Sequence, residues 1–107
     1  MINGTVNITT AAPVPIFTPK ADEWTDVYSI VISTNDIVAN QITISDGTTS
    51  LVYLAGGGAA GTPNPPIVDQ CAIPVRFKKG VPITVAAATI TGGRAIIVNV
   101  RGLTSKT

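Results

Sequence analysis

The segment QITISDGTTSLVYL, residues 41–54, constrains the fold of this chain more than any other stretch. Asp46-Gly47 is a turn signal typical of β-hairpins, and the residues on both sides of it can form strands. A two-residue loop there predicts a register in which Ile42 faces Leu51. Turn chemistry and burial both favour this hairpin, because it gathers the apolar side chains on one face: Ile42, Ile44, Leu51 and Tyr53.

The composition limits how a core can be built. Apolar residues make up 45% of the 107 residues but aromatic residues only 5%, so we expect one domain with a core of Val, Ile, Leu and Ala. Charged residues, at 12%, are about half of their usual share of roughly 25%. So little charge suits a protein that works against another surface, and a small β domain with a Thr/Ser/Asn exterior is the simpler alternative.

Strand-like segments follow one another along the chain, with turn residues between them. Besides the hairpin, such segments occupy residues 5–10, 27–33, 67–77, 81–88 and 94–101. A helical turn is plausible only at residues 21–26. Seven or eight short strands at this spacing predict an all-β fold, an antiparallel β-sandwich that is jelly-roll-like or a Greek key.

Proline and glycine divide the chain into regions. Three prolines between residues 13 and 19 each remove a backbone donor, so we predict that residues 1–20 form an extended arm with the first strand. Residues 21–107 then form the β-sandwich domain. The segment AGGGAAGTPNPP, residues 55–66, is predicted to be a long loop, and a loop of that length in a small domain is usually functional.

Net charge and cysteine content argue against several partners and compartments. A net charge of +1 predicts no binding of nucleic acid or of an anionic membrane, and the only local basic group is Arg76, Lys78 and Lys79. The single cysteine cannot form a disulfide within the chain, which fits assembly in a reducing cytoplasm. The chain shows no apolar run near the roughly 20 residues of a spanning helix, and its N-terminus lacks the features of a signal peptide.

The side chains that most enzymes need are missing from the sequence. Without histidine, neither a Ser-His-Asp triad nor a Cys-His nucleophile nor a Cys/His zinc site can form within the chain. We expect Cys71 to be a small buried hydrophobic residue. Asp22, Glu23 and Asp26 could gather around a calcium ion, although a solvated turn explains them more simply. We therefore predict a protein that is not an enzyme, with no catalytic residue, no cofactor and no metal.

Two further motifs could bind ligands. The glycines at 56–58 lack the pattern and the following helix of a phosphate-binding loop, so a flexible loop explains them better. Trp24 could stack on a sugar, as aromatic platforms do in carbohydrate-binding sandwiches. Tyr28 and Tyr53 are in register with the predicted core, which leaves Trp24 as the candidate for such a platform.

Several segments, taken in order, resemble a known class of proteins. They are the Tyr/Ile strand that ends in Ser-Thr-Asn, the ITISDGTT hairpin, the Gly/Pro loop, PVRFKKG, and two final strands of Val, Ile and Ala. As a pattern of strands over residues 26–102, this order resembles the small β-sandwich virion proteins of tailed bacteriophages, particularly capsid cement or decoration proteins and related head or tail modules. The resemblance implies a jelly-roll-like sandwich that binds symmetric sites on a capsid lattice, often as a trimer.

We therefore predict a noncatalytic virion structural protein, a cement or decoration subunit that stabilises the head of a bacteriophage. Its partners would be further copies in a trimer and the major capsid protein, on the capsid surface of a virion assembled in the host cytoplasm. The alternative is a host-recognition module at a tail or fibre tip that binds cell-surface carbohydrate. Contacts are predicted within residues 2–20, within 55–66 and at scattered side chains: Val14, Ile16, Phe17, Trp24, Gly57, Pro63, Pro65, Arg76 and Lys78.

Overall fold

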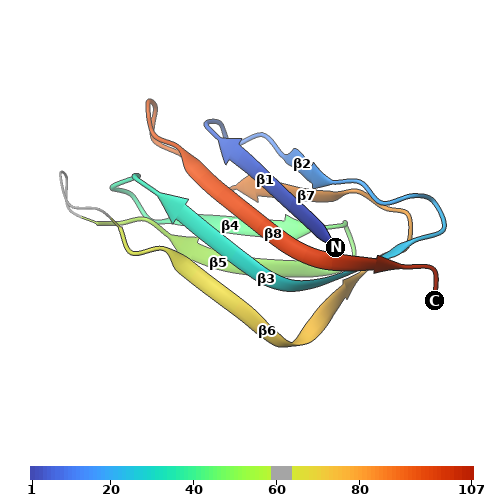
Figure 1. Cartoon of the computed structure of the whole chain (residues 1–107). Helices are drawn as coiled ribbons and strands as arrows, with labels where there is room; N and C mark the ends of the chain where they lie inside the picture. Colours follow the sequence, from blue (N-terminus) through green and yellow to red (C-terminus); the bar gives the residue numbers. More distant parts are fainter. Residues whose placement is uncertain (59–63) are drawn as a thin grey trace.

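A computed structural model describes residues 1–58 and 64–107 of the chain, with the side chain of Ala72 left out. The described residues form eight strands in two stacked sheets (Figure 1). The strands are β1 (Ile2–Ile8), β2 (Val14–Phe17), β3 (Trp24–Thr34), β4 (Asn40–Ser45), β5 (Ser50–Ala55), β6 (Ile67–Phe77), β7 (Ile83–Ala87) and β8 (Ile96–Ser105). Over the same ranges, no helix has the length and apolar character needed to cross a membrane.

The order of the strands identifies the topology. Sheet 1 has the order β1-β8-β3-β6 and sheet 2 the order β2-β7-β4-β5, and every described pairing is antiparallel. Apart from the β4–β5 hairpin, each connection crosses from one sheet to the other. This is the eight-stranded jelly roll, which is built from two Greek keys. The predicted all-β antiparallel sandwich is confirmed.

The core lies between the sheets and consists mainly of Ile and Val side chains. Every second residue of the central strands points inward, as the alternation in β4 and β7 shows. Phe77 is the largest side chain that is fully buried. Around it lie the other buried apolar residues: Ile8, Val27, Ile30, Ile32, Ile42, Ile44, Ala55, Ile83, Val85, Ala87, Ile96, Val98 and Val100. Each such Ile or Val contributes roughly 1.5–3 kcal/mol of transfer free energy.

The β4–β5 hairpin has the predicted buried face but a different register. Its loop spans residues 46–49, so that Ile42 pairs with Tyr53 and Ile44 with Leu51. The Asp46 carboxylate causes this longer loop, because its Oδ1 accepts hydrogen bonds from the backbone N–H groups of Thr48 and Thr49 at 2.8 and 2.6 Å. The predicted two-residue loop is therefore wrong by two positions, a shift that leaves each side chain on its predicted face.

The N-terminal residues are built into both sheets. β1 is an edge strand paired with β8, and β2 pairs with β7. The prolines do not prevent this second ladder, because β2 is also an edge strand and its register shifts between Pro15 and Phe17. The segment predicted as an extended arm, residues 1–20, therefore contributes one edge strand to each sheet.

A β-bulge in β3 changes which side chains face the core. The register of β3 shifts between Val27 and Ser29, so Val27 and Ile30 are both buried although they are three residues apart. Tyr28 consequently lies on the outer face of sheet 1, and its predicted place in the core is wrong. The helical turn expected at residues 21–26 is also not formed, because β3 already begins at Trp24.

Asp36 ties the two sheets together at one end of the sandwich. This fully buried carboxylate follows β3 of sheet 1 and accepts a hydrogen bond from Asn40 Nδ2 at the start of β4 in sheet 2. It also accepts hydrogen bonds from the backbone N–H groups of Thr91 and Val38 and from the Thr91 hydroxyl. Burial alone would raise the pKa of Asp36, but these hydrogen bonds outweigh it and lower that pKa far below 3.8.

Candidate functional site

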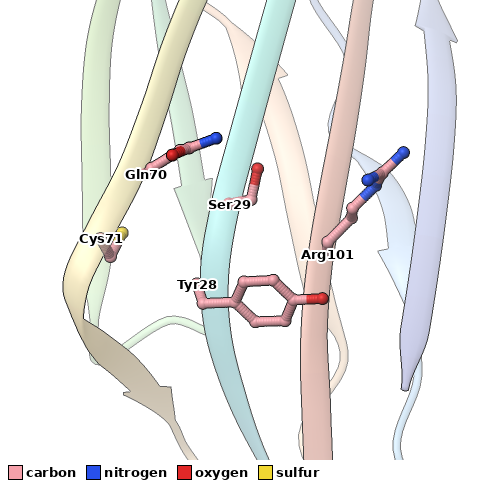
Figure 2. Close-up of a pocket in the computed structure, with 5 residues that line it drawn as sticks. All are labelled: Tyr28, Ser29, Gln70, Cys71 and Arg101. Carbon is pink, nitrogen blue, oxygen red and sulfur yellow. The ribbon is translucent and has the colours of Figure 1, made fainter.

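A pocket opens on the outer face of sheet 1, where two neighbouring strands lose their regular register. Opposite Tyr28, the partner positions on β6 jump from Val75 to Gln70, and the extra residues of β6 bend that strand outward (Figure 1). The resulting hollow has a volume of about 300 Å³. Its lining residues are Tyr28, Ser29, Gln70, Cys71 and Arg101 (Figure 2).

Strand pairing places three of these side chains in one row across the sheet. Ser29 on β3 is the partner of Gln70 on β6 and of Arg101 on β8. Figure 2 shows Gln70 pointing from β6 toward β3, Ser29 between the strands, and Arg101 pointing from β8 toward β1. The Tyr28 ring lies across β8, and its hydroxyl donates a hydrogen bond to the Met1 sulfur at 3.0 Å. The pocket thus combines hydrogen-bond donors with one aromatic wall.

The two other charged side chains on this face neutralise each other. Arg76 donates from Nε and Nη2 to the two carboxylate oxygens of Asp26, at 2.7 and 2.9 Å, in a bidentate ion pair. The same guanidinium lies 5.2 Å from the centre of the Trp24 ring. The hydrogen bond from Arg76 holds the pKa of Asp26 below its ordinary value, so this pair stays ionised at neutral pH.

The thiol at the pocket edge is held in its protonated form. Burial, and then the negative charge of Asp69, raise the pKa of Cys71 above 9.0. Asp69 accepts a hydrogen bond of 2.6 Å from the Tyr53 hydroxyl, which links the edge strands β5 and β6. A thiol that stays protonated at neutral pH is a poor nucleophile. Cys71 was predicted to be a small buried hydrophobic residue. This prediction is wrong, because its side chain is half-buried at the edge of the pocket.

The nine predicted contact residues do not form one site. Val14, Ile16 and Phe17 lie on β2, and Ile16 packs against the core. Trp24 and Arg76 lie together in the cation–π contact, at the opposite end of the sandwich from the Asp36 cluster.

The remaining predicted contacts lie in loops. Gly57 donates its backbone N–H to the Asp36 carbonyl at 3.2 Å, and Pro65 is exposed near the other end of the same loop. Lys78 is exposed, and its backbone N–H donates to the Asp46 carboxylate. Pro63 lies outside the described residues. The structure therefore distributes these residues over β2, the loop base and the Trp24 end.

The acidic residues near position 22 each have a separate partner. Asp22 lies 3.4 Å from the Lys106 ammonium, and the Glu23 carboxylate accepts the Lys20 backbone N–H at 3.2 Å. Asp26 is bound by Arg76. In the part of the chain that the structure describes, no three acidic, cysteine or histidine side chains come together as metal ligands would.

Tyr28 and Cys71 were predicted to lie in the core, and Ser29, Gln70 and Arg101 were not singled out from the sequence. Their only local signal is the spacing of Val27 and Ile30, since two inward residues three positions apart on a strand indicate a bulge. Tyr28 hides that signal, because it continues the apolar alternation of Ile30 and Ile32. Gln70 and Arg101 join Ser29 only through the order of the strands.

Comparison with known proteins finds a likeness in fold. No family model matches the chain, and no curated protein matches it in sequence. A chain of the solved structure "Cyanophage Pam1 capsid asymmetric unit" matches with a TM-score of 0.53 and 15% sequence identity. The match covers 95% of this chain and 79% of that chain. At this identity it shows a common architecture over nearly the whole jelly roll.

Proposed function

We propose that this chain is a noncatalytic structural protein of a phage virion, a cement or decoration subunit that binds and stabilises the head. The likeness in fold to a chain of a cyanophage capsid, over 95% of the present chain, carries this proposal. Eight-stranded jelly rolls are also a common fold of viral capsid proteins in general.

The surface chemistry supports binding to other proteins. The outward residues of sheet 2 are uncharged throughout: Pro15, Gln41, Thr43, Ser45, Ser50, Val52, Leu54, Thr84 and Ala86. Val52 and Leu54 are 55% and 70% exposed. Protein interfaces are depleted in charge at their centre, because an unpaired charge costs free energy when water is removed.

The segments 2–20 and 55–66 are the contact regions of this proposal. The second is anchored at both ends by the loop that follows β3. Asn64 Nδ2 donates to the carbonyl oxygens of Thr34 and Asp36 at 3.1 and 3.0 Å, and Gly57 binds the same Asp36 carbonyl. These hydrogen bonds hold the two described ends of the segment, at Gly57 and Asn64, against the loop that follows β3.

Copies of the chain would act together on the shell. We propose a trimer that contacts the major capsid protein at symmetric lattice positions on the outside of the virion. Linked binding sites gain overall affinity by avidity, so each contact can be weak while the shell is stabilised.

The test is the presence of the chain in purified particles of the phage that encodes it. Quantitative mass spectrometry should find it in a fixed ratio to the major capsid protein, and native mass spectrometry of the free chain should give a trimer. Particles without the chain would contradict the virion role, and a monomer would contradict the trimeric cement subunit. Selective binding on a glycan array would instead favour the host-recognition alternative.

A further inference from the structure

Arg101 gives the sheet 1 pocket a positive charge that no acidic side chain in the described ranges, 1–58 and 64–107, balances. Of the other charged groups on this face, Asp26 and Arg76 are bound to each other. Asp69 lies on β6, two strands from β8, pairs with buried Ile30 and accepts the Tyr53 hydroxyl, so it is not placed to bind Arg101. Among the described residues no carboxylate lies within ion-pair distance of Arg101. The pocket can therefore bind an anionic group that another molecule supplies.

The side chains around Arg101 determine which anion fits. A guanidinium is planar and donates in pairs, which matches the two oxygens of a carboxylate. The Ser29 hydroxyl and the Gln70 amide lie in the same row and can donate to a group held there. No lining residue is acidic, and the Tyr28 ring supplies an apolar wall for a short methylene stem.

We propose that this pocket receives the carboxylate of an aspartate or glutamate side chain presented by a partner protein. Arg101 points toward β1 in Figure 2, so its side chain would turn back over β3 to bind the carboxylate, with Ser29 and Gln70 as further donors. The side-chain stem would lie along Tyr28. A volume of about 300 Å³ accommodates such a side chain.

A protein partner fits this face better than a small free acid. The same outer face of sheet 1 also presents Val68, Ile97 and Leu103, which are 58%, 47% and 52% exposed. A free acid would leave these apolar side chains in water, whereas a protein surface would cover them and remove water from around the ion pair. This choice of partner rests on the proposed function, while the complementarity of the pocket to a carboxylate does not.

The test uses the full chain, labelled with ¹⁵N, and two probes that differ only in charge. N-acetyl-glutamate methylamide carries the carboxylate, and N-acetyl-glutamine methylamide is its neutral counterpart. At constant ionic strength, the glutamate probe should shift the resonances of Ser29, Gln70 and Arg101 saturably, and the glutamine probe should not. Arg101→Gln should weaken that binding about fivefold.

Arg94→Gln is the matched control, because it removes the same charge from the turn before β8, outside the pocket. It should leave binding of the glutamate probe unchanged. Equal shifts with both probes, unchanged binding in Arg101→Gln, or an equal loss in Arg94→Gln would overturn the proposal. If particles contain the chain but the glutamate probe does not bind, the carboxylate pocket fails and the virion role stands. If the probe binds but particles lack the chain, the virion role fails and the pocket stands.

Discussion

The outer faces of the two sheets cover one hydrophobic core but differ in shape and charge. On sheet 1, the bulge in β3 opens the pocket, and the face carries Asp26, Arg76 and Arg101. On sheet 2, β4 pairs with both of its neighbours without a shift in register, and the outward side chains are uncharged. The shape and charge of each outer face are therefore not determined by the core that the two sheets share. One face is shaped to recognise a particular group, and the other offers broad uncharged contact.

The largest effect is expected from Asp36→Asn, because this substitution weakens the hydrogen bonds that connect the two sheets. Asn40 and Thr91 both donate hydrogen bonds to the Asp36 carboxylate. The amide of Asn would replace one carboxylate oxygen by an NH₂ group, so that a donor would face a donor. We expect a loss of about 3 kcal/mol in the free energy of unfolding. Urea denaturation measures it. Asp22→Asn, which alters an exposed ion pair, is the control and should leave the midpoint unchanged.

The pairing beside the bulge in β3 should also tolerate substitution less well than the regular pairing of β4. A Cβ at position 102 would collide with the backbone carbonyl oxygen of Asp26, next to the bulge in β3. Gly102→Val should therefore cost about 2 kcal/mol of stability. Thr43→Val on sheet 2 changes a half-buried side chain of the same shape and should cost less than about 0.5 kcal/mol. Similar losses in both variants, seen in thermal unfolding, would remove the contrast between the sheets.

Acid should weaken the connection between the sheets before it affects the core. The pKa of Asp36 is lowered in the folded state, so the unfolded chain takes up a proton first as the pH falls. The stability that Asp36 contributes is complete well above pH 3.8 and is lost as the pH falls through and below that value. The loss approaches about 1.4 kcal/mol per pH unit for one group. Urea denaturation of Asp36→Asn should show a shallower pH dependence, and an unchanged slope would count against this assignment.

The smallest effect is expected from the exposed ion pair on sheet 1. Asp26→Asn weakens the bidentate contact with Arg76 but leaves the stacking on Trp24 in place. We expect a loss of about 0.5 kcal/mol, since solvent screens a pair of this exposure. The difference from the wild type should shrink in high salt. If the loss of stability in Asp26→Asn does not depend on salt, then packing rather than charge determines the contribution of the Asp26–Arg76 pair.

The sequence predicted the inward faces of the sandwich well and its irregularities poorly. Ile42 and Ile44 are buried as predicted, because alternation depends only on neighbours along the strand. The hairpin register was missed because the Asp46 side chain replaces backbone partners in the loop. Asp36 was not singled out, because its main partner, Thr91, lies 55 residues away in the sequence.

The pocket was beyond sequence reasoning for a similar reason. Arg101 occupies an ordinary outward position in an alternating strand, and nothing near it in the sequence suggests a ligand. Its partners Ser29 and Gln70 join it through the jelly-roll order β8-β3-β6, which alternation alone does not determine. The predicted contact at Arg76 was visible as a local basic group, but its guanidinium is bound to Asp26.

Hydroxyl-radical footprinting of the chain on particles, compared with the free chain, tests most directly whether sheet 1 is the face that docks. Tyr28 and Cys71 report on the pocket, and Val52 and Leu54 report on sheet 2. Docking through sheet 1 predicts that oxidation of Tyr28 and Cys71 falls on binding, whether or not the uncharged face of sheet 2 around Val52 and Leu54 is covered as well. Unchanged oxidation of Tyr28 and Cys71 on the particle would contradict it.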